Sequence, residues 1–119
     1  MKNEILRLEK SFFQLQYMND VNWLNMTLHP DFKEFGKSGA MIHKSEVIES
    51  LMQCTKDRDI AIYNYEFMQV DVNTFLVHYV TKESDMLYYR TSLWVKEECL
   101  RSVFHQASKV NAFIESELF

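Results

Sequence analysis

The chain has 119 residues, which is enough for one domain with a single hydrophobic core and too short for two. A hydrophobic fraction of 47%, with only two Gly and one Pro, argues against disorder and against flexible linkers. Because the net charge is −4, with no basic stripe, no long apolar run and charges throughout the N-terminal MKNEILRLEK, we expect a cytoplasmic protein that binds neither nucleic acid nor a membrane.

The N-terminal half is predicted to be mostly helical, with one short strand. Residues 3–17 carry apolar residues at helical spacing, which predicts an amphipathic helix with Asn3 as its N-cap. Asp20 can cap a shorter second helix, which ends before Pro30 because a residue preceding proline avoids the α region. The segment DFKEF is predicted to be a strand and GKSG a turn. After AMIH, the segment KSEVIESLMQC returns to helical spacing, with Ser45 as its cap.

The apolar period changes to two from residue 60 onward. IAIYNYEFMQV, TFLVHYVT, MLYYRTSLWVK and CLRSVFHQA alternate in this way and are separated by short polar connections. They predict consecutive antiparallel strands, and hence an α+β fold with the helices packed on one face of a meander sheet. Residues 108–119 return to a helical pattern and are predicted to be a C-terminal extension, as a helix or docking arm, of a single domain spanning residues 1–119.

Counting residues outward from the predicted turns places polar side chains on one face of this sheet. We take Val72-Asn73, Ser84-Asp85 and Glu97-Glu98 as two-residue turns, and a period of two then keeps alternate residues on the same face. The count predicts a lateral row with one side chain from each strand, made of Glu66, Tyr79, Arg90 and His105. Ser92 and Trp94 lie beside the row, so the face combines polar groups with apolar walls, as small-molecule pockets do.

The opposite face of the predicted sheet is too apolar to be left in water. Its residues are Tyr63, Tyr65, Phe67, Leu76, Val80, Leu87, Tyr89, Leu93, Val95 and Phe104. The helices can cover only one face, so we expect them to close a cavity over the polar row. The other face is then predicted to pack against its copy in a homodimer.

Three motifs, HPDFKEFGKSGAMIHKSEVIESL, YYRTSLWV and VFHQ, resemble the SnoaL-like branch of the nuclear-transport-factor-2-like (NTF2-like) superfamily. In that branch DF-x-E-x-G-x-SG precedes a helix, and R-x-S-x-W precedes a final FHQ strand. The resemblance runs to Gln106, and its matched positions are Phe32, Glu34, Gly36, Ser38, Gly39, Arg90, Ser92, Trp94, His105 and Gln106. It implies a cystatin-like cone, in which a curved sheet wraps a pocket closed by helices and dimerises through its outer face.

Arg90 is the main candidate for ligand binding, because a guanidinium can clamp a carboxylate, phosphate or enolate oxygen. Pairing with Glu34 or Glu66 is its structural alternative. His105 and Glu34 are the candidates for moving a proton, and a core histidine bonded to a backbone carbonyl or to Ser92 is the structural alternative for His105. The residues predicted to contact a ligand are Arg90, Ser92, Tyr79, Trp94, Glu66 and Phe32.

No cofactor or metal is expected from the cysteines and histidines. Cys54 and Cys99 lack CxxC spacing, and His29 with Asp31 fits no ligand signature. Three functions remain open. The first is a domain that binds a small, partly apolar ligand with an anionic or carbonyl oxygen. The others are an isomerase, dehydratase or cyclase working by acid–base chemistry, and a noncatalytic association module. The superfamily includes all of these, although no residue here matches the catalytic aspartate of its characterised cyclases and steroid isomerases.

Overall fold

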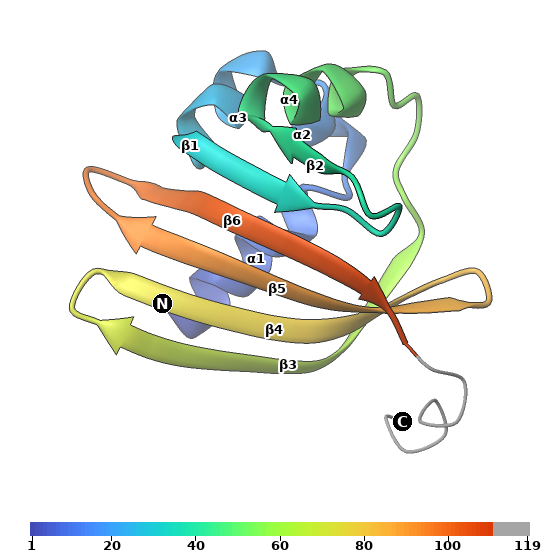
Figure 1. The fold of residues 1–119 in the computed structure, drawn as a ribbon. Coiled ribbons are helices and arrows are strands. Elements are labelled where there is room, and N and C mark those ends of the chain that lie inside the picture. The colour runs from blue at the N-terminus through green and yellow to red at the C-terminus, as the bar shows by residue number, and fades with distance from the viewer. Residues whose placement is uncertain (111–119) are drawn as a thin grey trace.

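The computed structural model describes residues 1–110 and confirms the predicted α+β class, with N-terminal helices on a mixed sheet (Figure 1). In chain order the elements are α1 Lys2–Ser11, α2 Leu15–Met18, α3 Val21–Thr27, β1 Leu28–Phe35, β2 Met41–His43, α4 Lys44–Met52, β3 Ile60–Asp71, β4 Thr74–Glu83, β5 Met86–Lys96 and β6 Leu100–Lys109. Val110 packs against Val80 and Leu87. The rest of the predicted C-terminal helix or arm lies outside the described residues. Within residues 1–110, no helix has the length and apolar character needed to cross a membrane.

The first predicted helix is in fact two helices. α1 ends at Ser11, and α2 begins at Leu15, whose backbone N–H donates to Asp57 Oδ1 at 2.6 Å. Arg58 N–H donates to the carbonyl of Phe13 at 2.8 Å. The segment before β3 therefore supplies long-range partners to the backbone between the two helices, which helical periodicity alone cannot reveal.

Two of the three predicted helix caps are wrong. Asp20 caps α3 as predicted, accepting from the Trp23 N–H at 3.0 Å. The N-cap of α1 is Met1 instead of Asn3, and that of α4 is His43 instead of Ser45. The His43 N–H donates to Glu46 Oε1 at 3.1 Å, so this helix start is stabilised by the acid in its first turn.

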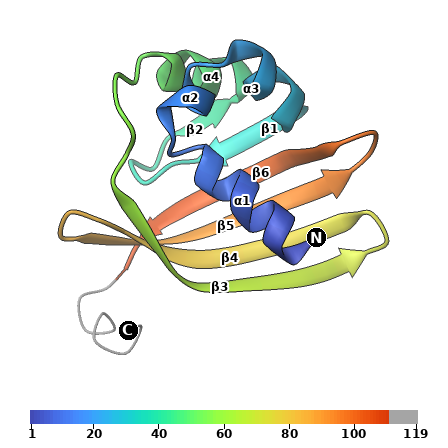
Figure 2. The same cartoon turned by 180° about the vertical axis from the view of Figure 1, so that it is seen from behind.

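The sheet has the strand order β2-β1-β6-β5-β4-β3. Its last four strands form the predicted antiparallel meander, and β1 extends it by pairing parallel to β6. Figure 2 shows α1 lying across the inner face of the sheet, while α2, α3 and α4 gather beyond β1 and β2. Within residues 1–110, the helices thus cover the inner face and leave the outer face open.

Bulges change the predicted register at both ends of the polar row. Tyr79 lies opposite Arg90, as predicted. The β5–β6 loop has one residue more than predicted, and a bulge follows between Leu93 and Trp94, so Ala107 instead of His105 lies opposite Arg90. The longer loop and the bulge each shift the pairing by one residue. Because a shift of two residues restores the alternation of faces, His105 still lies on the inner face, opposite Ser92.

The register of β3 is shifted as well. Glu66 pairs with His78 instead of Tyr79, because it lies between two irregularities of the β3–β4 ladder. This single-residue shift moves it to the outer face. Tyr65 and Phe67, predicted on the outer face, instead pack on the inner face against the main core. That core consists of Ile5, Leu8, Phe75, Val77, Tyr79, Trp94 and Leu100.

Candidate functional site

A cavity of about 340 Å³ lies between the inner face of the sheet, the C-terminal end of α1 and the β1–β2–α4 segment. Its apolar lining residues are Phe12, Phe13, Leu28, Phe32, Ala40, Ile42, Val47, Leu51 and Ala107. Its charged lining residues are Glu9, Glu34, Lys37, Arg58 and Arg90. Tyr79, Ser92 and His105 also border it. This size and this mixture of a mostly apolar wall with a few polar groups are those of small-molecule sites.

Glu9 is the buried acid of this site, and it was not among the residues predicted from the sequence. Its side chain, on α1, is 4% exposed and accepts hydrogen bonds from the Tyr79 hydroxyl, from Ser92 Oγ at 3.1 Å and from Trp94 Nε1 at 2.6 Å. Burial raises the pKa of Glu9, while these donors and the charge of Arg90 oppose the rise. The available signal was its place four residues after Ile5, within the buried stripe of α1.

Arg90 lies on β5 and is almost fully buried, at 6% exposure. Its Nε donates to Thr81 Oγ1 at 2.7 Å, and its Nη1 lies 3.4 Å from His105 Nε2. Within residues 1–110, Nη2 is buried and has no hydrogen-bond partner. Burial lowers the pKa of Arg90, but a guanidinium remains charged in proteins. The site therefore holds a buried cation with one free donor group.

His105 is neutral at physiological pH. Burial and the neighbouring charge of Arg90 lower its pKa to about 3. Its Nδ1 lies 2.6 Å from Ser92 Oγ, so the predicted structural contact with Ser92 is present. An imidazole acts as a general acid in its doubly protonated imidazolium form, and His105 does not take up the second proton near neutral pH.

Ion pairs hold two further cations beside the cavity. Arg58 donates to Glu83 through Nε and Nη2 at 3.2 and 3.0 Å, and Lys37 Nζ lies 3.3 Å from Glu83 Oε1. Hydrogen bonds from Arg58 lower the pKa of Glu83. Glu34 also lines the cavity, and burial raises its pKa against the opposing charges of Arg90 and Arg58.

Comparison with known proteins gave matches only among solved structures. No family model and no curated protein matches the chain. An NTF2-like protein from Cytophaga hutchinsonii aligns with a TM-score of 0.76 at 18% identity, over 92% of this chain and 98% of its own. The chain has the NTF2-like fold. The resemblance to the SnoaL-like branch stays a prediction.

Proteins of different function share this NTF2-like fold. A protein proposed to be a ketosteroid isomerase, from Parabacteroides distasonis, aligns with a TM-score of 0.73 at 15% identity, over 95% of this chain and 90% of its own. The association domain of C. elegans CaMKII aligns with a TM-score of 0.69 at 14% identity, over 90% and 94%. At these identities the likeness shows the fold alone, so function has to be argued from the site.

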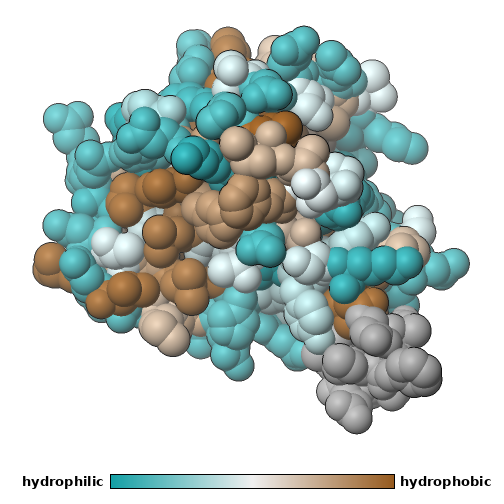
Figure 3. All heavy atoms as spheres, in the orientation of Figure 1, coloured by the Kyte–Doolittle hydropathy of each residue, from teal (hydrophilic) through white to brown (hydrophobic). Residues whose placement is uncertain are grey.

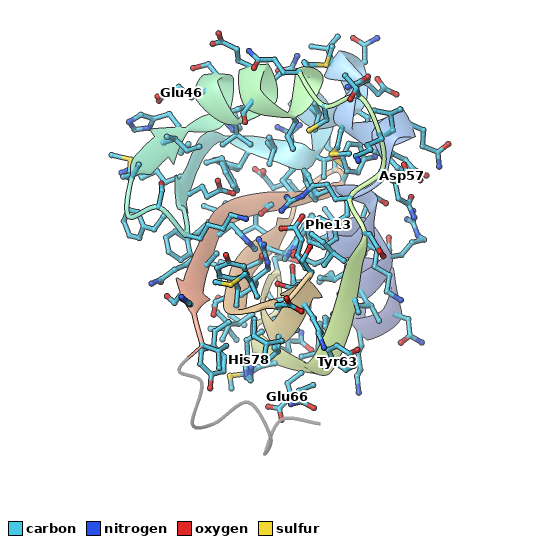
Figure 4. The ribbon with its side chains drawn as sticks, turned by 90° about the vertical axis from the view of Figure 1, so that its right-hand side faces the viewer. Phe13, Glu46, Asp57, Tyr63, Glu66 and His78 are labelled. Atoms are coloured by element: carbon cyan, nitrogen blue, oxygen red, sulfur yellow. The ribbon has the colours of Figure 1, made fainter. Side chains whose placement is uncertain are left out.

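Among the sequence-predicted residues, the NTF2-like fold brings Arg90, Ser92, Tyr79, Phe32, Glu34 and His105 to the cavity. Trp94 is fully buried and serves as a donor to Glu9, not as a cavity wall. The predicted place of Glu66 is wrong, since its Oε2 pairs with His78 Nε2 at 3.3 Å on the outer face. Figure 4 shows these two side chains together, well away from Phe13 at the cavity.

Metal chemistry has no support from side-chain clustering. Among the described residues, no group of three or more His, Cys, Asp or Glu side chains could hold an ion.

Proposed function

We propose that this NTF2-like cavity binds a small, largely apolar molecule that carries a carboxylate or a similar anionic oxygen. The observation that carries the proposal is that Arg90, a residue of the cavity wall, has an Nη2 without a hydrogen-bond partner among residues 1–110. A buried cation with an unsatisfied donor is costly, and an anionic ligand oxygen would relieve that cost. Lys37 and Arg58 add positive charge to the same cavity. Phe12, Phe13 and Phe32 would contact the apolar body of the ligand.

The test compares two probes of nearly the same shape, the anionic 2-naphthoate and the neutral 2-naphthamide, by isothermal titration calorimetry. The acid should bind about tenfold or more tightly than the amide, as expected for one charge-assisted hydrogen bond. Arg90→Gln should abolish this preference, whereas Arg101→Gln on the same sheet should keep it. Equal affinity of the wild-type protein for acid and amide would contradict the proposal, whatever happens to the folding of the variants.

A carried ligand can be sought directly by native mass spectrometry of the protein as purified. A small molecule that leaves on denaturation, and that contains an acidic group, would agree with the proposal. A released molecule that is basic or strongly polar throughout would contradict it.

Glu34 favours acid–base catalysis as a second candidate function. Its carboxyl has a raised pKa and faces the cavity beside Arg58 and Arg90, which could stabilise a developing enolate oxygen. Incubation with 2-indanone in D₂O should then exchange the α-protons faster than buffer alone, as followed by proton NMR. Glu34→Gln should remove the excess rate. Exchange at the buffer rate would count against this function.

The outer face, which no helix of residues 1–110 covers, supports self-association as a homodimer. Figure 3 shows hydrophobic residues gathered on this side of the sheet. Leu76, Leu93 and Phe104 are successive partners across β4, β5 and β6 and are only half-buried. Phe35 and Tyr89 are exposed. Apolar area of this kind in water usually marks an interaction surface.

A further inference from the structure

Glu9, Ser92, His105 and Arg90 form a continuous chain of contacts from α1 across the sheet to the cavity. Ser92 Oγ lies 3.1 Å from Glu9 Oε1 and 2.6 Å from His105 Nδ1, and His105 Nε2 lies 3.4 Å from Arg90 Nη1. A serine hydroxyl has one proton, and a neutral imidazole has one N–H and one acceptor nitrogen. The direction of each hydrogen bond in this chain is therefore fixed by its neighbour.

The two end residues of this series, Arg90 and Glu9, permit only one donor-to-acceptor direction of its hydrogen bonds. Arg90 can only donate, so His105 Nε2 has to accept and the imidazole proton lies on Nδ1. This Nδ1–H then donates to Ser92 Oγ, which leaves the Ser92 proton for Glu9 Oε1. Oε1 also accepts from Tyr79, and it remains an acceptor even when the carboxyl carries a proton on Oε2.

We infer that Glu9 is a positioning residue, which acts through Ser92 and His105 to hold the guanidinium of Arg90 in its place in the wall of the cavity. His105 Nε2 and Thr81 Oγ1 occupy Nη1 and Nε of the guanidinium. With the other imidazole tautomer, the Nε2–H of His105 and the Nη1–H of Arg90 would face each other, and the guanidinium would lose this contact. The last step, from the position of Arg90 to ligand affinity, rests on the proposed function. The predicted tautomer of His105 does not depend on the proposed function.

Glu9→Gln tests the chain because Trp94 dictates how the new amide is oriented. The indole N–H can only donate, so the amide oxygen has to face Trp94 and the NH₂ group has to face Tyr79 and Ser92. The Ser92 proton then has no acceptor at residue 9, so we expect it to turn toward His105 Nδ1, which moves the imidazole proton to Nε2. A purely structural role of Glu9 would lower stability without this switch.

The tautomer is read from two-bond ¹H–¹⁵N spectra of the histidine-labelled protein at neutral pH, with His105→Gln used for assignment. The wild-type protein should show His105 as Nδ1–H, Glu9→Gln as Nε2–H, and the matched control Glu66→Gln as Nδ1–H. Nε2–H in the wild-type protein overturns the inference even if Glu9→Gln fails to fold. Nδ1–H in a folded Glu9→Gln overturns it too.

The same variants are then titrated with 2-naphthoate and 2-naphthamide. Glu9→Gln should weaken naphthoate binding about tenfold and leave the amide nearly unchanged, as expected for a displaced charge-assisted donor. A tautomer switch with unchanged naphthoate affinity would overturn the link from Glu9 to Arg90. If the wild-type protein does not distinguish acid from amide, the proposed function fails, while the tautomer still decides the role of Glu9.

Discussion

At the scale of single residues, the buried acid depends on its donors. Tyr79 is 2% exposed and donates its hydroxyl proton to Glu9, whereas Tyr89 is 39% exposed on the outer face. Tyr79→Phe leaves the buried carboxyl with one donor fewer and should lower the free energy of unfolding by roughly 1–3 kcal/mol. Tyr89→Phe should change it by less than about 0.5 kcal/mol. Urea unfolding of both variants measures the difference, and equal effects would contradict this role of Tyr79.

The second residue-scale prediction concerns pH. Burial raises the pKa of Glu34 above 4.5, its ordinary value. Between the unfolded and the raised folded pKa, the folded state binds more protons, so stability falls as pH rises through that window. Glu34→Gln should reduce this fall without removing it, because burial raises the pKa of Glu9 as well. Unfolding free energies measured from about pH 4 to 8 test this against Glu66→Gln, and a slope unchanged by Glu34→Gln would be the contrary result.

The residues of the site could be predicted where alternation alone decides their position. Arg90, Ser92 and Tyr79 lie on regular parts of β4 and β5, and each reaches the inner face as expected. Glu9 was missed because a helical pattern shows which face of a helix is buried but does not show which polar side chains find hydrogen-bond partners there. Glu66 was misplaced because nothing in its sequence marks the flanking irregularities.

At the scale of elements, the turn between β1 and β2 depends on one backbone conformation. Gly39 has φ +88°, in the left-handed region, and a Cβ there would meet nothing within 4 Å. Gly39→Ala should therefore lower the unfolding free energy by roughly 1–2 kcal/mol through backbone strain alone. Gly36→Ala is the control, because its Cβ would lie 3.8 Å from its nearest neighbour, the Ala40 carbonyl. Thermal unfolding that ranks Gly36→Ala as the more damaging change would refute this reading of the turn.

Long-range pairing explains what the sequence could not show about the elements. The four meander strands were predictable because each follows its neighbour through a short connection. The parallel pairing of β1 with β6 joins segments far apart in the chain, and no local pattern encodes it. The division of α1 from α2 likewise depends on Asp57 and Arg58, which lie more than forty residues further along.

At the scale of the whole molecule, the two faces of the sheet have different surroundings. The helices of residues 1–110 lie on the inner face, as Figure 2 shows, where α1 and α4 border the cavity, and they leave the outer face open. Because alternate residues of one strand point to opposite faces, Arg90 and Leu93 on β5 serve different surfaces. A change on the outer face should therefore affect assembly while leaving ligand binding intact.

The homodimer proposal gives this separation a direct test. Leu93 lies at the centre of the outer face, between Leu76 and Phe104, so Leu93→Glu would place a charge inside a dimer interface. Sedimentation equilibrium should find the wild-type protein dimeric and Leu93→Glu monomeric, with naphthoate affinity preserved. Val21→Glu, at an exposed position on α3, should remain dimeric. A monomeric wild-type protein would contradict the proposal, and a dimeric Leu93→Glu would place the contact elsewhere, since an interface of roughly 1,600 Å² does not tolerate an unpaired charge at its centre.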